Sequence, residues 1–91
     1  MKVSFYATLE PIVGERHADV PLPPGARVRD LVAYLSERWP GLAEHLLEDS
    51  GELSRRVNIF LEGRNVRWLD GLETLIEPGQ AVDIFPPVAG G

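Results

Sequence analysis

Apolar and polar residues alternate at the start of the chain. The apolar positions of this stretch are Val3, Phe5, Ala7 and Leu9. The residues between them are mostly polar, so an extended chain would bury one face and expose the other. The pattern predicts a first strand over residues 2–9, and Gly14 within residues 13–16 predicts a hairpin turn after it.

The alternation returns over residues 18–22, where Ala18, Val20 and Leu22 are apolar. This stretch predicts a second strand. Prolines at positions 21, 23 and 24 lack the N–H that a sheet ladder needs. The second strand should therefore end early or lie at a sheet edge.

Apolar residues then recur at helical spacing. They occupy the positions Val28, Leu31, Val32, Leu35 and Trp39. This spacing places them on one face of a helix, and Pro24-Gly25 before and Pro40-Gly41 after them form its boundaries. The pattern predicts a helix over residues 27–39, a short helical turn over residues 42–47 and an acidic loop over residues 48–52.

Strand-like alternation fills much of the second half of the chain. A third strand is predicted over residues 57–61, a tight turn over residues 62–65 and a short fourth strand over residues 66–68. The last strand is predicted over residues 81–85. Its two faces are formed by Val82 and Ile84 on one side and by Asp83 and Phe85 on the other.

The order of the predicted elements is strand, strand, helix, strand, short strand, strand. This order is typical of an α+β domain in which one mixed sheet carries one main helix on one face. If the helix connects the second and third strands of that sheet, these two strands can pair in parallel with a right-handed crossover. The predicted domain is similar to the ubiquitin-like β-grasp, in which the first and last strands lie side by side at the centre. We expect residues 1–85 to form this domain and residues 86–91 to form an extended tail.

Three aromatic residues are predicted on the sheet face that the helix does not cover. Phe85 is out of phase with Val82 and Ile84, and the same alternation places Tyr6 and Phe60 on that face. Exposed aromatic side chains serve as contact anchors, although a small secondary cluster under a loop is the alternative. Because Phe85 adjoins the tail, we interpret Phe85 with Tyr6 as a partner-binding site.

The tail itself is the most distinctive chemical feature of the chain. Two prolines follow Phe85, and the tail ends in Gly90 and Gly91. Glycine lacks Cβ and passes through slots that exclude other residues, whereas the prolines hold the root of the tail extended. We expect the terminal carboxylate to be the reactive group; the alternative is a frayed chain end.

The composition narrows the chemistry. The 91 residues contain no cysteine, which excludes a disulfide, a thiolate metal site and a cysteine nucleophile. A formal net charge of −5 argues against nucleic acid and favours a partner with a basic surface. No apolar run approaches the ~20 residues of a membrane span, and the N-terminus lacks a signal-peptide pattern. We therefore expect a cytoplasmic protein without a membrane partner.

The polar side chains form no recognisable catalytic or metal-binding constellation. His17 and His45 have no partners at metal-ligand spacing. The serines lack a histidine and an acid at recognisable spacing, and the glycines are isolated turn residues. We therefore predict no metal site and no bound cofactor.

Residues 57–74, the Pro78-Gly79 turn and the ending Phe-Pro-Pro-Val-Ala-Gly-Gly at residues 85–91 resemble the MoaD/ThiS family of ubiquitin-like sulfur carriers. The first strand and the helix resemble that family too, so the likeness covers essentially the whole chain. The ending is most similar to the small-subunit branch of molybdopterin synthase, and the central run is also similar to the CysO-type carriers.

The resemblance implies that an adenylating enzyme of the MoeB/ThiF type uses ATP to activate the carboxylate of Gly91. A sulfur donor then converts the acyl-adenylate to a thiocarboxylate. The tail delivers this sulfur to the molybdopterin synthase large subunit or to another sulfur-accepting enzyme. In this scheme Gly91 bears the sulfur, Gly90 threads through a narrow channel, and Phe85 and Tyr6 contact the partner. The catalytic side chains belong to the partners, so the chain is a co-substrate or a subunit of a sulfur transferase.

Other functions fit the same Gly-Gly ending. In the first function the protein supplies sulfur for molybdopterin synthesis. In the second it supplies sulfur for cysteine, for a thiolated transfer RNA base or for another product. A ubiquitin-like modifier that is conjugated to lysines is a third. A β-grasp binding module with an inert tail is a fourth. The sequence does not separate the first three, because each requires an activated Gly91.

Overall fold

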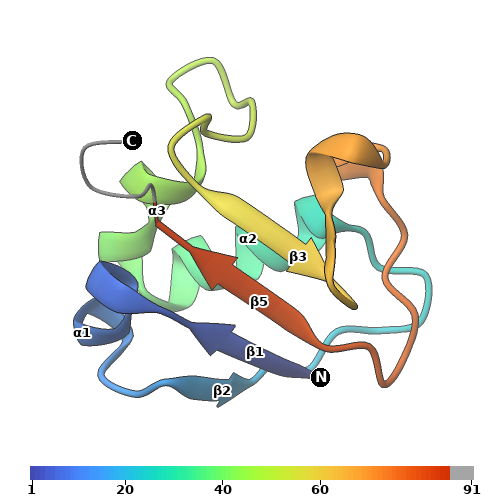
Figure 1. Ribbon diagram of the computed structural model, residues 1–91, viewed down its shortest axis with the longest axis horizontal. Helices are drawn as coiled ribbons and strands as arrows, with labels where there is room; N and C mark the ends of the chain where they lie inside the picture. Colours follow the sequence, from blue (N-terminus) through green and yellow to red (C-terminus); the bar gives the residue numbers. More distant parts are fainter. Residues whose placement is uncertain (87–91) are drawn as a thin grey trace.

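The computed structural model describes residues 1–86, which form one mixed five-stranded sheet with its main helix on one face (Figure 1). The strand order is β2-β1-β5-β3-β4. The strands are β1 (Lys2–Phe5), β2 (His17–Asp19), β3 (Asn58–Leu61), β4 (Arg64–Asn65) and β5 (Val82–Phe85). The helices are α1 (Glu10–Val13), α2 (Val28–Arg38) and α3 (Pro40–Leu46), with 3-10 turns η1 (Ala7–Leu9), η2 (Val66–Trp68) and η3 (Gly71–Glu73). The predicted α+β class and the ubiquitin-like β-grasp are confirmed.

The centre of the sheet is the parallel pair of β1 and β5, as predicted. Val3 lies opposite Val82 and Phe5 lies opposite Ile84. The other three pairings are antiparallel. β2 is a short edge strand, in agreement with the prolines that follow it. The first and last strands thus lie side by side although nearly the whole chain separates them.

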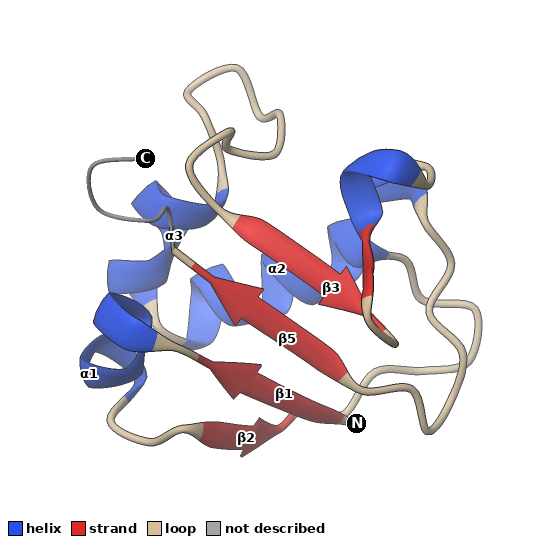
Figure 2. Cartoon of the chain, in the orientation of Figure 1, coloured by secondary structure: helices blue, strands red, loops and turns tan. Residues whose placement is uncertain are grey.

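The helix-covered face of the sheet carries the core. Helix α2 occupies residues 28–38, within the predicted range 27–39, and lies behind the sheet in Figure 2. Its apolar stripe packs on side chains of β1, β3 and β5, as predicted. The residues of this contact are each 1% exposed or less: Val28, Leu31, Val32, Leu35, Val3, Phe5, Ile59, Val82 and Ile84. Trp39 extends the core by an edge-on contact with Phe5, with ring centroids 5.8 Å apart.

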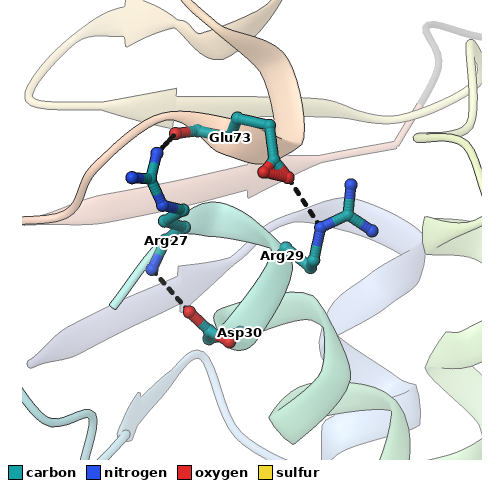
Figure 3. A network of polar contacts seen from close by, with 4 residues as sticks. All are labelled: Arg27, Arg29, Asp30 and Glu73. Atoms are coloured by element: carbon teal, nitrogen blue, oxygen red, sulfur yellow. Dashed lines mark hydrogen bonds and ion pairs between the residues drawn. The ribbon is translucent and has the colours of Figure 1, made fainter. Parts of the chain in front are cut away.

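Exposed polar contacts hold the start of α2 (Figure 3). The backbone N–H of Arg27 donates to Asp30 Oδ2 at 2.8 Å, so Asp30 satisfies a free amide at the helix start. Arg27 also donates to the carbonyl of Glu73 at 2.6 Å, and Arg29 Nε donates to the Glu73 carboxylate at 2.7 Å. These contacts connect α2 to η3. Because the Arg29–Glu73 pair is exposed, we expect it to contribute at most about 1 kcal/mol.

The prediction of a first strand over residues 2–9 was wrong at its end. β1 stops at Phe5, Ala7 has a φ of 51°, and η1 and α1 follow. The alternation gave a wrong strand end because Leu9 belongs to the 3-10 turn η1, and its side chain reaches the core from that turn and not from a strand. Pro11 cannot donate to a sheet ladder but fits the first turn of a helix. Gly14 then ends α1 in the left-handed region, with a φ of 92°, and does not form a hairpin turn.

The prediction of a fourth strand over residues 66–68 was also wrong. The strand is β4, and the turn before it contains only Glu62 and Gly63, with φ of 49° and 80°. Two positive φ angles are typical of a two-residue type I′ hairpin turn. The chain then bends into η2 because the Asn65 side chain accepts from the N–H of Arg67 at 3.0 Å. The Arg67 guanidinium in turn donates to the carbonyls of Ser54 and Val57.

Pro40 begins α3, and the predicted helical turn there is confirmed, with Leu42 and Leu46 buried. None of the helices in residues 1–86 combines the length and the apolar character that crossing a membrane requires.

Candidate partner-binding site on the open sheet face

The structure brings Tyr6, Phe60 and Phe85 together on the face of the sheet opposite α2. No helix of the described chain covers this face in Figure 2. The rings of Tyr6 and Phe85 are stacked, with centroids 4.2 Å apart and planes at 7°. Phe60 meets Phe85 edge-on, with centroids 5.4 Å apart and planes at 89°. All three side chains are half-buried, so their predicted placement is confirmed. Their binding role stays a prediction.

The strand registers explain this cluster. Phe85 of β5 lies opposite Asn58 of β3, and Asp83 lies opposite Phe60. Because side chains alternate along a strand, Asp83 and Phe85 face away from the core that Val82 and Ile84 enter. Residues 83 and 85 therefore meet the aromatic ring of β3 on one surface, which we call the open face.

Tyr6 is held in the cluster by a hydrogen bond between distant parts of the chain. Its hydroxyl donates to Asp83 Oδ1 at 2.9 Å. This bond raises the pKa of Tyr6 above its ordinary value of 10.0, and burial and the negative charge of Asp83 raise the pKa further. Tyr6 is thus a neutral donor at neutral pH, and its ring is fixed over Phe85.

Polar pairs border the aromatic cluster on both sides. Ser4 Oγ and His17 Nδ1 are hydrogen-bonded at 2.8 Å toward the β2 edge. Asn65 Nδ2 donates to Asn58 Oδ1 at 3.2 Å toward the β4 edge. The open face therefore has a mainly aromatic centre, which also contains the Asp83 carboxylate, between two hydrogen-bonded polar pairs. Such a surface resembles the anatomy of a protein interface, with an apolar core and a polar rim.

Two hollows adjoin the root of the tail, and Pro86 lines both. The first hollow lies on the open face beside Phe85 and has a volume of about 490 Å³. It is lined by Asn58, Phe60, Gly63, Asp83, Phe85 and Pro86. The second hollow has a volume of about 470 Å³ and lies next to α3. It is lined by Thr8, Leu9, Glu44, His45, Ser54, Arg56, Val57 and Pro86.

Gly90 and Gly91, the other predicted site residues, fall in residues 87–91 and so lie outside the described residues. Phe85 and Pro86 show where the tail begins. Within residues 1–86, His, Asp and Glu side chains nowhere gather in a group of three or more that could hold a metal ion.

The contacts of Asp83 were not predicted from the sequence. Its alternation with Phe85 placed it on the open face, but only the structure shows that its carboxylate contacts Tyr6 and lines the hollow beside Phe60. The signal that was present in the sequence is a carboxylate two positions before an aromatic residue on the uncovered face of a strand.

Comparisons with known proteins agree with this fold and this ending. The model of the ThiS family matches residues 3–91. Small archaeal modifier protein 3 of Haloferax volcanii is 40% identical over 91 residues, which cover 100% of this chain and 98% of that relative. A molybdopterin synthase sulfur carrier subunit of Pyrenophora tritici-repentis is 30% identical over 89 residues, or 98% of this chain and 87% of that relative.

A solved structure has the same fold over nearly the full length of both chains. A chain in the crystal structure of the Amycolatopsis orientalis BexX/CysO complex superposes with a TM-score of 0.84 at 28% identity and covers 99% of this chain and 98% of that one. The family match over nearly the full length, together with the full-length relative, shows that this chain belongs to the ThiS family of ubiquitin-like sulfur carriers.

Proposed function

We propose that this protein carries sulfur as a thiocarboxylate on Gly91 and donates it to molybdopterin synthesis as the small subunit of molybdopterin synthase. The observation that carries the proposal is the position of Phe85. Its ring lies in the aromatic cluster of the open face, and it directly precedes the tail that begins at Pro86 and ends in Gly90-Gly91. A partner that binds the cluster therefore receives the tail.

The proposed chemistry begins with an unreactive carboxylate. An activating enzyme of the MoeB/ThiF type transfers AMP from ATP to the Gly91 carboxylate and releases pyrophosphate, which forms a mixed anhydride. A sulfur nucleophile attacks the acyl carbon, the C–O bond to AMP breaks, and a thiocarboxylate remains. The chain contains no cysteine, so the terminal carboxyl group is the position for the sulfur.

The part of this chain in the reaction is docking and positioning. The aromatic cluster anchors the partner, and a six-residue tail beyond Phe85 reaches at most about 20 Å into its active site. A narrow channel there shields the sulfur from water. The net charge of −5 favours encounter with a basic surface on the partner.

Conjugation to protein lysines is the second candidate function. It is favoured by the 40% identity to small archaeal modifier protein 3 over essentially the whole of both chains. In this case a lysine amine, and not a sulfur acceptor, attacks the activated Gly91 carbon. Sulfur donation of the CysO type is a third outcome, supported by the likeness to the BexX/CysO structure.

Intact-mass spectrometry tests the proposal. Incubation with ATP, the cognate activating enzyme and sulfide should replace one carboxyl oxygen by sulfur and raise the mass by about 16 Da, through the activated acyl intermediate. The molybdopterin synthase large subunit with its precursor should then return the mass to its first value. If a competent activating enzyme never raises the mass, sulfur carriage is refuted.

Two variants serve as controls. Deleting Gly91 should abolish the mass shift without unfolding the domain, and replacing Gly90 by valine should block it by steric exclusion from the channel. A mass shift of equal yield in the Gly91 deletion would place the modification elsewhere. Lysine-linked adducts of the wild-type protein in cell extract, with no sulfur transfer to the large subunit, would favour the modifier function.

A further inference from the structure

The hollow beside Phe85 combines aromatic walls with a carboxylate. Phe60 and Phe85 stand at 89° to each other and form two of its walls, and Asp83 lies opposite Phe60 and two residues before Phe85 on β5. Of the six residues that line the hollow, Asp83 alone carries a charge. The hollow therefore presents a single negative charge inside an otherwise uncharged and largely apolar surface.

The Asp83 carboxylate retains free acceptor capacity. Within residues 1–86 its hydrogen-bond partner is the Tyr6 hydroxyl, which binds Oδ1. A carboxylate has about four acceptor positions in total. In the same range no lysine or arginine forms a salt bridge with Asp83. Tyr6 thus orients the carboxylate and leaves Oδ2 available to a donor from outside.

An arginine side chain matches this combination better than the other cations of proteins. Its guanidinium is planar, stacks on aromatic rings and pairs with a carboxylate through parallel N–H donors. A lysine ammonium is a compact and strongly hydrated charge, which is less suited to an aromatic hollow. A neutral side chain would leave the Asp83 charge uncompensated when the partner excludes water from it.

We propose that the hollow beside Phe85 receives an arginine side chain of the enzyme that docks on the open face, with its guanidinium stacked on the aromatic walls and paired with Asp83. The arginine assignment rests on the proposed function, because it supposes that the open face binds a partner. It makes Asp83 a specificity-determining residue, since a partner without this cation would bury an unpaired carboxylate. The negative net charge of the chain favours such a basic partner surface.

Nuclear magnetic resonance titration with N-acetyl-arginine amide tests the assignment on the full chain. We expect saturable shifts of the backbone amides of Phe60, Asp83 and Phe85. N-acetyl-citrulline amide has nearly the same shape without the charge, so it should cause much smaller shifts, and N-acetyl-lysine amide should bind more weakly. No saturable shift with the arginine probe, or equal shifts with citrulline, would overturn the proposal.

Variants locate the binding. Asp83→Asn removes the charge but keeps an oxygen that accepts from Tyr6, and it should weaken binding of the arginine probe about tenfold. Phe60→Leu keeps the core unchanged and removes one aromatic wall, so it should weaken the same binding to a smaller extent. Asp49→Asn makes the same charge change in the exposed 48–52 loop and is the matched control. Equal weakening by Asp49→Asn would show a general charge effect and would refute the assignment.

Failure of the arginine assignment can be distinguished from failure of the proposed function. If the wild-type protein never acquires the thiocarboxylate with a competent activating enzyme, sulfur carriage fails whatever the arginine probe does. If the thiocarboxylate forms but Asp83→Asn binds the probe as well as the wild type, only the arginine assignment fails.

Discussion

The two faces of the sheet are formed by the same strands but differ in what their side chains contact. On the helix-covered face, Ile84 and its neighbours meet the stripe of α2 and lose nearly all contact with water. On the open face, Phe85 and Asp83 are half-buried and contact aromatic and hydroxyl groups. The adjacent residues Ile84 and Phe85 thus have different surroundings: Ile84 packs in the core, and Phe85 lies on the face to which the proposed function assigns partner binding.

Under the proposed function, a domain of 91 residues keeps its stability and its partner binding on separate faces of one sheet. A strand has a period of two, so each added pair of residues contributes one side chain to each face. The covered face can remain close-packed while the open face varies to suit a partner. The separation predicts that substitutions on one face change stability and that substitutions on the other face change binding.

The largest expected effect is on the covered face. Truncation of a fully buried side chain removes its apolar contacts and leaves a cavity, so Leu35→Ala and Ile84→Ala should each lower the free energy of unfolding by roughly 2–5 kcal/mol. Equilibrium denaturation in urea measures this loss. A loss below about 1 kcal/mol, small for a fully buried side chain, would mean that the contact between α2 and β5 is not the main core.

The next effect is on the open face. Phe85→Ala should weaken binding of the cognate synthase large subunit by about 2 kcal/mol or more, because an aromatic anchor at the base of the tail is lost. The domain should stay folded, because Phe85 is not part of the buried core. Titration calorimetry measures the affinity.

Trp68→Ala is the matched control for Phe85→Ala. Trp68 is 84% exposed in η2 and does not line the hollow beside Phe85. Its truncation should leave the affinity unchanged. If Trp68→Ala weakened binding and Phe85→Ala did not, the partner would dock on the surface of η2 and η3. The assignment of the open face as the partner-binding site would then be wrong.

The smallest effect concerns the hydrogen bond between Tyr6 and Asp83. The pKa of Tyr6 is raised in the folded protein above its ordinary value of 10.0, so the folded state holds the phenol proton more tightly than the unfolded chain. The contribution of this proton to stability is complete below pH 10.0 and is lost as the pH rises through the folded-state pKa.

Two measurements detect this loss. The phenolate absorbance of the wild type minus that of Tyr6→Phe should titrate above pH 10.0, and Asp83→Asn should move it back toward that value. The stability difference between wild type and Tyr6→Phe should be constant below pH 10.0 and shrink above it. A Tyr6 titration unchanged by Asp83→Asn would contradict Asp83 as the cause of the raised pKa.

The periodicity of the sequence was enough to predict which faces of α2, β3 and β5 enter the core. Alternation identified β5 and its two faces, and the helical stripe placed α2 to within a residue at each end. These features depend on local periodicity, because burial of one face requires apolar residues at every second position of a strand or at every third and fourth position of a helix. The placement of Tyr6, Phe60 and Phe85 on one face follows from the same rule.

The end of β1 and the contacts of the open-face residues did not follow from the sequence pattern, because both depend on tertiary packing. Leu9 is an apolar residue in phase with Val3 and Phe5, but it is buried in a helical turn. The periodic pattern is the same in both cases, so it did not reveal that the strand ends after Phe5. Tyr6 and Asp83 are 77 positions apart in sequence, and they meet because β1 and β5 pair in parallel. A periodic pattern predicts which face of the sheet a side chain lies on, whereas the residue that the side chain contacts depends on the neighbouring strand and its register.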